Sequence, residues 1–244
     1  MKRDRYFFIL NCILLLAVLM GFAPSFYLRP LSDQAALPIH LILHGIACTA
    51  WFLSIFMQAL LVQKQKINAH KTFGKYASLI APAVFISGLW VMQGRIQNFY
   101  TKNGSELAGR PDFREFESML IAGDTIALIS FLILVYLGYR FRHKIHHHKR
   151  YMLFASIMIV PQAFVRIGKY AFLQLGDDPG ASGSLYAVAG PVLMLFSLLI
   201  YDRKKLGKVH AVTKLSWVWY IGLLATATLL MRTGWGADLL EAFQ

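Results

Sequence analysis

Long apolar stretches alternate with short polar connections along the whole chain. Seven of these stretches approach the length of about 20 predominantly apolar residues that a helix needs to cross a bilayer. In lipid the backbone must satisfy its own hydrogen bonds, and a helix does so within a single segment. The pattern therefore predicts an all-α integral membrane protein, a single transmembrane domain over residues 1–244. The predicted spans are 7–27, 39–62, 73–94, 116–138, 151–172, 186–201 and 214–231.

The composition favours a membrane protein and excludes a soluble binder of polyanions. The chain is 57% hydrophobic and 15% charged, yet its formal net charge is +13. Soluble domains carry about 25% charged residues. A water-soluble nucleic-acid-binding protein is therefore excluded, and no nucleic-acid partner is expected.

The basic residues gather on one side of the predicted membrane. Of the 25 Lys and Arg residues, 17 lie in or beside the N-terminal segment and the connections that follow spans two, four and six. Cytoplasmic connections carry an excess of Lys and Arg. We therefore expect a bacterial inner-membrane protein with a cytoplasmic N-terminus, an external C-terminus and a basic face against anionic lipid headgroups. The 17 residues are Lys2, Arg3, Arg5, Lys64, Lys66, Lys71, Lys75, Arg140, Arg142, Lys144, Lys149, Arg150, Arg203, Lys204, Lys205, Lys208 and Lys214.

Two of the cytoplasmic connections are similar in sequence. Each has a histidine followed by a basic residue, then an Ala-Ser pair and a proline. All of the matches except the proline are 78 residues apart, and a third connection, at His210, is only loosely similar. Internal repeats of this kind build many membrane folds, so we expect repeated helical hairpins. The matched residues are His70-Lys71-Thr72-Phe73, Ala77-Ser78 and Pro82 in one connection, and His148-Lys149-Arg150-Tyr151, Ala155-Ser156 and Pro161 in the other.

A longer set of residues stands in a characteristic order across spans two to seven. The set is His44-Gly45, Trp51, Gln58, Leu61-Val62, His70-Lys71, Gly74, Asp124, Phe131, His148-Lys149-Arg150, Met152, Arg166, Tyr201-Asp202 and Val209-His210. In this order the residues resemble a family of bacterial membrane proteins of about seven spans, whose members have no assigned activity. Lys71 stands where the family usually has arginine, and Ala211 where it commonly has proline. The resemblance implies the seven-span fold, and some members are distantly similar to haem-binding cytochrome b bundles.

One candidate site lies in the outer half of the predicted membrane and consists of His40, His44, Asp124 and Arg166. His40 and His44 are four residues apart and therefore share a helix face. Asp124 and Arg166 fall at similar depth in spans four and five, and ionisable residues inside a membrane usually pair and face the bundle interior. The cluster predicts either an outward-opening pocket for a small ligand, quinone, haem propionate or metal, or an ion pair that only fixes two helices.

A second candidate site lies at the cytoplasmic face and consists of His70, His148, Asp202 and His210, with His143, His146 and His147 as substitutes. Three imidazoles and a carboxylate suit a tetrahedral zinc site or an iron site with an open position. Because they come from three different connections, their spacing does not require them to converge. The alternative is a cationic surface of histidines, lysines and arginines against lipid headgroups.

Two other histidine chemistries can be compared with this pattern. His40-x-x-x-His44 and His143-x-x-His146-His147 are similar to the histidine boxes of membrane desaturases, but the predicted topology places them on opposite faces. A haem held by two histidines needs them at matching depth on neighbouring helices. His70 and His148 offer such a pair at the membrane edge, so haem b or a transition metal is the cofactor that these histidines suit.

Three classes of function stay open. The first is a histidine-based haem or metal redox protein. The second is a transporter or sensor for a small anionic or lipophilic solute, in which the outer cluster binds and the repeated hairpins move. The third is a non-catalytic scaffold whose polar residues lock helices together. Broken helices mark many transport sites; Pro82 and Pro161, one in each repeat, come closest, but their surroundings do not predict a break.

Overall fold

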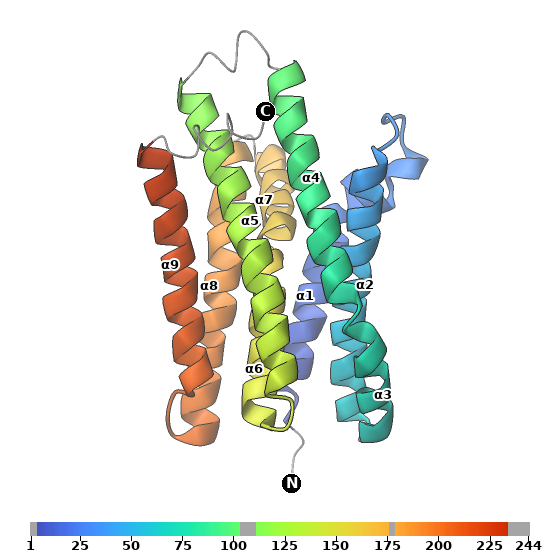
Figure 1. Ribbon diagram of the computed structural model, residues 1–244, viewed down its shortest axis with the longest axis vertical. Helices are drawn as coiled ribbons and strands as arrows, with labels where there is room; N and C mark the ends of the chain where they lie inside the picture. Colours follow the sequence, from blue (N-terminus) through green and yellow to red (C-terminus); the bar gives the residue numbers. More distant parts are fainter. Residues whose placement is uncertain (1–3, 103–110, 176–178, 234–244) are drawn as a thin grey trace.

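The computed structural model describes residues 4–102, 111–175 and 179–233, and these residues form a bundle of long helices without a strand (Figure 1). The main helices run along the long axis of the molecule. Their bounds are Tyr6–Phe22 (α1), Ile39–Gln63 (α2), Ile67–Ala77 (α3), Ile80–Lys102 (α4), Pro111–Arg140 (α5), Ile145–Ile159 (α6), Pro161–Leu175 (α7), Pro179–Leu206 (α8) and Ala211–Thr233 (α9). A π-helical turn, Ala23–Tyr27 (η1), and a 3₁₀ turn, Arg29–Leu31 (η2), follow α1.

The connections gather at the two ends of the bundle. Residues 4–5 and the turns 64–66, 141–144 and 207–210 lie at the lower end in Figure 1, which we call the basic end. The segment 28–38 lies at the opposite end, which we call the far end. The turns predicted to be cytoplasmic thus share one end of the bundle, with the described residues 4–5 of the N-terminal segment. The C-terminus, predicted to be external, lies outside the described residues.

The helices are long and apolar enough for five membrane spans, or six if the bent pair α6 and α7 counts as one. The single spans are Tyr6–Tyr27, Ile39–Gln63, Ile67–Asn98, Leu120–Arg140 and Gly183–Leu206. They and the bent pair correspond to the first six predicted spans. The seventh prediction, 214–231, falls on α9, which is a helix but is not among these candidates.

The predicted span 151–172 is not one continuous helix. It breaks after Ile159, and the axes of α6 and α7 differ by 47°. Pro161 explains the break, since it has no backbone N–H to donate to the carbonyl of Ile157 and it disfavours helical geometry at Val160. A broken helix that the sequence did not predict is therefore present at one of the two repeat prolines.

The two similar connections fold alike. In each, a lysine precedes a short helix that begins at an isoleucine, Ile67 in α3 and Ile145 in α6, and these positions keep the 78-residue offset. Each short helix is followed by an interruption before the next helix begins, at residues 78–79 and at residue 160. The proline of each repeat lies in the first turn of that next helix.

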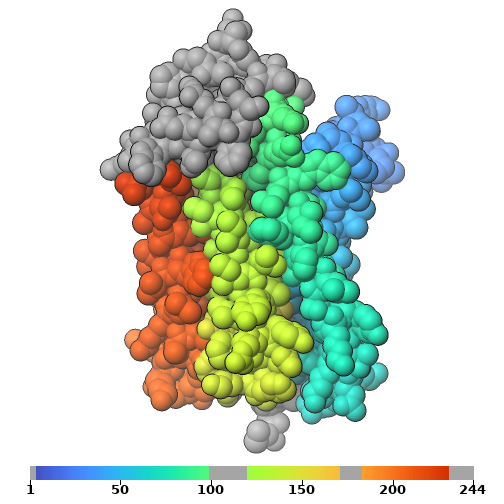
Figure 2. Space-filling model, viewed as in Figure 1, coloured from blue at the N-terminus to red at the C-terminus, as the bar shows by residue number. Residues whose placement is uncertain are grey.

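The bundle is closed by a core of large side chains and is apolar on its outside. The Trp51 ring meets Phe131 edge to face with centroids 4.8 Å apart, and its indole N–H donates to the Ser156 hydroxyl at 3.2 Å. Figure 2 shows α9, α5 and α4 side by side on one face. Val218 on α9 and Ile86 on α4 are 70% and 66% exposed. Such apolar surfaces fit contact with lipid.

Candidate functional site

A cavity of about 720 Å³ occupies the half of the bundle toward the far end. Side chains from α1, α2, α4, α5, α6, α7, α8 and α9 line it, and most of them are apolar. Ligand pockets usually measure about 300–1,000 Å³ and place a few polar groups in an apolar wall. The cavity therefore has the size and the mixed lining of a small-molecule site. Its charged lining residues are Arg29, Arg95, Asp124 and Arg166.

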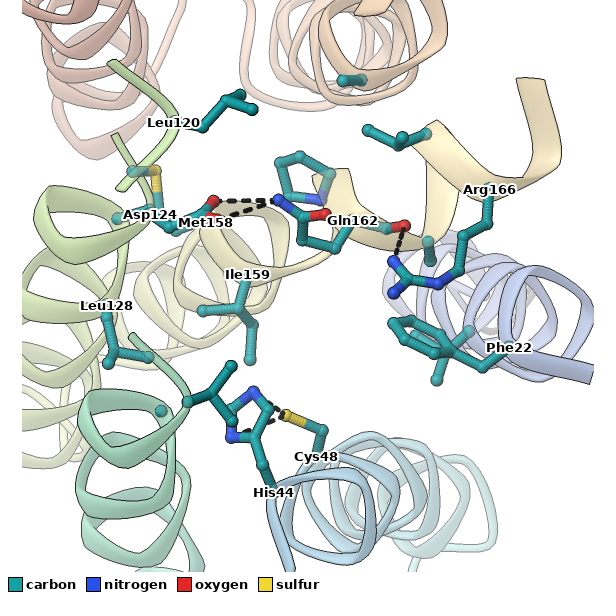
Figure 3. A pocket seen from close by; sticks show the side chains of 18 of the residues that line it. Phe22, His44, Cys48, Leu120, Asp124, Leu128, Met158, Ile159, Gln162 and Arg166 are labelled. Atoms are coloured by element: carbon teal, nitrogen blue, oxygen red, sulfur yellow. Dashed lines mark hydrogen bonds between the residues drawn. The ribbon is translucent and has the colours of Figure 1, made fainter. Parts of the chain in front are cut away.

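Asp124 lies at the cavity wall on α5 and is held by residues from two other helices. Its two carboxylate oxygens accept hydrogen bonds from the Gln162 side-chain amide at 3.0 and 3.1 Å (Figure 3). Arg95 of α4 forms an ion pair with it, with Nη1 3.6 Å from Oδ2. Gln162, which sequence reasoning missed, sits in the first turn after the break at Val160. It thereby connects the broken span to α5.

Arg166 lines the same cavity, but its hydrogen bond and its ring contact are with Gln162 and Phe22, and the charge of Asp124 acts on it without a direct contact. Its Nη1 donates to the backbone carbonyl of Gln162 at 3.0 Å, and its guanidinium carbon lies 4.2 Å from the centre of the Phe22 ring. Figure 3 shows Gln162 between Arg166 and Asp124. The ion pair expected from equal depth is thus replaced by an indirect connection through Gln162.

His44 also lines the cavity, with both ring nitrogens engaged. The Ser87 hydroxyl donates to the Ala83 carbonyl at 2.6 Å, so it accepts from His44 Nδ1 at 3.0 Å. His44 Nδ1 therefore carries the proton, and Nε2 accepts from the Cys48 thiol at 3.4 Å. His44 acts here as a neutral hydrogen-bonding group of the wall. A Cβ at Gly88 would come within 2.6 Å of the Leu128 side chain and 3.3 Å of the His44 ring, so glycine lets α4 approach α5 beside His44.

His40 is not part of the cavity lining. Its ring lies beside Trp90 with centroids 5.9 Å apart, and a Cβ at Gly94 would come within 2.7 Å of its Nε2. Although His40 and His44 share a face of α2, the former packs on α4 one turn nearer the far end. Three of the four residues in the predicted outer cluster thus line one cavity, and His40 contacts α4 instead.

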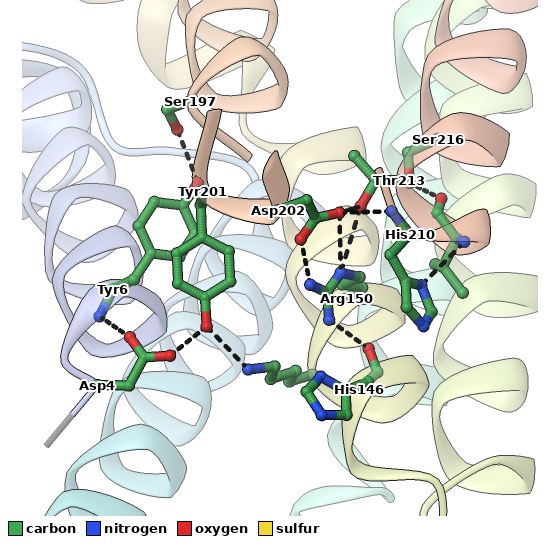
Figure 4. Close-up of polar contacts among 12 residues, drawn as sticks. Asp4, Tyr6, His146, Arg150, Ser197, Tyr201, Asp202, His210, Thr213 and Ser216 are labelled. Carbon is green, nitrogen blue, oxygen red and sulfur yellow. Dashed lines mark hydrogen bonds and ion pairs between the residues drawn. The ribbon is translucent and has the colours of Figure 1, made fainter. Parts of the chain in front are cut away.

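The basic end holds a buried ion pair between Arg150 of α6 and Asp202 of α8, both with fully buried side chains. Arg150 Nη2 donates to Asp202 Oδ1, while Nε lies 3.4 Å from Oδ2 and 3.2 Å from the Thr213 hydroxyl. A further donor, Nη1, reaches the His146 carbonyl at 2.8 Å (Figure 4). This network joins three helices, and Arg150 was not among the predicted site residues.

The Asp202 carboxylate also accepts hydrogen bonds from residues other than Arg150. Its Oδ2 accepts from the Thr213 hydroxyl at 2.5 Å and from the His210 backbone N–H at 3.0 Å. The His210 ring in turn accepts the Val212 N–H at Nδ1, at 3.1 Å, and so caps the start of α9. Burial and the nearby Arg150 charge lower the pKa of His210 to about 4, so the ring is neutral at pH 7.

The predicted four-residue metal cluster does not assemble. His210 lies near His147, with ring centroids 4.6 Å apart, whereas His70 lies near His148, with centroids 6.3 Å apart. Among the described residues no group of three or more His, Cys, Asp or Glu side chains is arranged to hold a metal ion. His143 is exposed and is not part of either histidine group.

The His70–His148 pair keeps one feature of a ligand site. His148 Nδ1 donates to the Gly138 carbonyl at 2.8 Å, so its Nε2 carries a lone pair. His70 Nδ1 and the side-chain oxygen of Gln58 are buried and have no hydrogen-bond partner among the described residues. Buried polar atoms are normally paired, so this corner of the bundle is incompletely satisfied.

A second network at the basic end was also missed by sequence reasoning. The Tyr201 hydroxyl donates to the Asp4 carboxylate and accepts from Lys149 at 3.3 Å. Burial opposes ionisation of Asp4, but hydrogen bonds from Tyr201 and from the Tyr6 N–H, with the charge of Lys149, hold its pKa below the ordinary value. The signal in the sequence was the Tyr201-Asp202 pair. Tyr201 belongs to this network, and Asp202, the next residue, belongs to the network of Arg150.

Comparison with known proteins gives no relative: no protein-family model, curated protein or solved structure matches the chain significantly.

Proposed function

We propose that the chain is a seven-span protein of a bacterial inner membrane, with its basic end in the cytoplasm and its cavity open toward the outer leaflet. Six spans follow from the candidate helices and the bent pair. The seventh is α9, whose 23 residues reach about 34 Å at 1.5 Å per residue, enough to cross the hydrocarbon core. The charge at the basic end supports the orientation.

Two single cysteines test this orientation in a background whose native cysteines are replaced by alanine. Leu31→Cys lies at the far end and Lys208→Cys in a turn at the basic end. A membrane-impermeant maleimide should label Leu31→Cys in intact spheroplasts and Lys208→Cys only in inverted vesicles. The reverse pattern overturns the orientation.

Within this membrane protein, we propose that the far-end cavity binds a small amphiphilic molecule, as the binding site of a transporter or sensor. The main support for this proposal is the cavity itself. Its wall is mainly apolar and includes four polar residues, His44, Asp124, Gln162 and Arg166. A scaffold needs polar residues that lock helices, but it has no need for an open volume of about 720 Å³ between them.

The break between α6 and α7 favours a transporter or sensor, whose binding site changes shape, over a rigid scaffold. Met158, Ile159, Pro161 and Gln162 all line the cavity, and they flank the 47° bend between α6 and α7. Interrupted helices at binding sites are a recurring feature of transporters. Since Gln162 also bonds Asp124, a ligand that displaces this contact changes how α7 is held against α5.

A matched pair of substitutions on α9 tests the cavity. Ala227 lines it, whereas Ala225 is exposed on the same helix and is not part of the lining. With radiolabelled dodecanol and protein in nanodiscs, empty nanodiscs subtracted, Ala227→Trp should lower specific binding at least about tenfold, since tryptophan fills cavity volume. Ala225→Trp should bind as the native chain does. Equal binding by both variants, or no specific binding to the native chain, would count against the proposal.

A second candidate function is histidine-based metal or haem redox chemistry at the basic end. It is favoured by the fixed tautomer of His148 and the unpartnered lone-pair atoms of His70 and Gln58. All three residues would hold a metal ion bound alone, whereas only His70 and His148 would serve as ligands of a haem iron. The carbonyl of Gly138 would orient His148. Metal analysis and an absorption spectrum of the purified protein test whether a metal ion or haem is bound. Bound metal or a Soret band that both His70→Ala and His148→Ala remove would support redox chemistry at this end. A purified protein that contains no metal and shows no Soret band would contradict it.

A further inference from the structure

Arg166 is a half-buried cation in the cavity wall with most of its hydrogen-bonding capacity unused. A guanidinium has five N–H donors. One nitrogen donates to the Gln162 carbonyl at 3.0 Å, and the face of the group lies over the Phe22 ring at 4.2 Å. No acidic side chain among the described residues forms an ion pair with it. Such a group, away from bulk water, favours an anionic partner.

The other charged residues of the wall do not supply that partner. Asp124 already accepts two hydrogen bonds from Gln162 and pairs with Arg95. Arg29 is turned to its own loop, where it donates to the Ala35 carbonyl and the Gln34 side chain. Arg29 uses three nitrogens in hydrogen bonds and Arg95 pairs directly with Asp124, whereas Arg166 uses one nitrogen and meets the charge of Asp124 without a direct contact.

Most of the cavity wall is apolar. Phe22, Phe52, Val84 and Leu128 line the same cavity. A molecule that satisfies both surfaces has a single anionic group for the guanidinium and a hydrocarbon body for the rest of the volume. A carboxylate and a phosphate both match the planar fork of arginine with two parallel hydrogen bonds.

Resting on the proposed cavity function, we infer that its ligand is an amphiphile with an anionic head group, bound by Arg166 as the specificity-determining residue. The head group takes the free donors of Arg166, and the apolar body lies along the wall formed by α1, α2, α4 and α5.

Ligands of equal chain length test the inference. Dodecanoate, dodecyl phosphate and dodecanol are compared on the native chain in nanodiscs, with binding to empty nanodiscs subtracted. We expect at least one anion to bind about 10- to 100-fold more tightly than dodecanol, the range that charge-assisted hydrogen bonds give. The better of the two anions identifies the head group as carboxylate or phosphate.

Two substitutions test whether Arg166 causes the preference for anions over dodecanol. Arg166→Gln should bring the anions to within about twofold of dodecanol while the affinity for dodecanol stays unchanged. Arg142→Gln is the control, since Arg142 lies in a turn at the basic end, outside the cavity lining, and it should keep the native preference. If Arg166→Gln does not fold, Arg166→Lys replaces it and should weaken the preference, because lysine keeps the charge and loses the fork.

The outcomes separate this inference from the proposed function. Equal affinities for anions and alcohol on the native chain, with Ala227→Trp still abolishing both, overturn the anionic ligand and leave the cavity as a binding site. A preference that survives both Arg166→Gln and Arg166→Lys overturns the role of Arg166. Dodecanol binding that Ala227→Trp does not reduce overturns the proposed function.

Discussion

The two ends of the bundle treat buried charge in opposite ways. At the basic end, Asp202 is fully buried and surrounded by Arg150, Thr213 and the His210 N–H. At the far end, Arg166 stands in the wall of a cavity with donors to spare. A satisfied network fixes helices, whereas an unsatisfied cation next to empty volume is available to a ligand. On the proposed function, the Arg150–Asp202 network is structural and the cavity beside Arg166 binds the ligand.

The largest expected effect comes from breaking the basic-end pair. Asp202→Ala leaves Arg150 buried without its counter-charge, which we expect to cost about 3–5 kcal/mol of unfolding free energy. Unfolding of the detergent-solubilised protein measures the loss. The double variant Arg150→Met, Asp202→Leu removes both charges and should recover most of it. A single variant as stable as the native chain would contradict the structural role of this pair.

An intermediate effect is expected from pH at His210. Its folded pKa of about 4 lies below the ordinary value of 6.5, so the folded state disfavours the proton. The stability that neutral His210 provides is complete above about pH 6.5 and is lost as the pH falls toward 4. His210→Asn should flatten this part of the stability curve. His143→Asn, at an exposed position, should leave the curve as it is.

The smallest expected effect comes from removing the far-end cation. Arg166→Met loses one hydrogen bond to a carbonyl and the contact with Phe22 but no ion pair, so unfolding free energy should change by no more than about 1 kcal/mol. The same unfolding measurement applies. A loss as large as that of Asp202→Ala would mean that Arg166 is structural, and the contrast between the two ends would fail.

Hydropathy and charge predicted most of the fold because both are properties of composition along a segment. The helices over 39–63 and 120–140 and the gathering of basic turns at one end required no knowledge of packing. The break at Val160 was missed because a proline can open a helix, kink it or start a new one, and the choice depends on its neighbours in space.

The sites were harder to predict because depth along a helix says nothing about rotation around it. His40 and His44 share a face, yet only His44 lines the cavity. Asp124 and Arg166 have similar depth, yet Gln162 lies between them. Asp202 was singled out as a metal ligand because an acidic residue among basic ones is conspicuous, but its partner, Arg150, is hidden in a run of basic residues that resembles any cytoplasmic turn.

The most direct test of the account is a crystal structure of the protein with 12-bromododecanoate, located by the anomalous signal of bromine. We predict a bromine peak inside the cavity, with the carboxylate beside Arg166 and the chain against Val84 and Leu128. Bromine found only on the lipid-facing surface of the helices, with the cavity free of it, would contradict the central claim that the far end is a ligand-binding site.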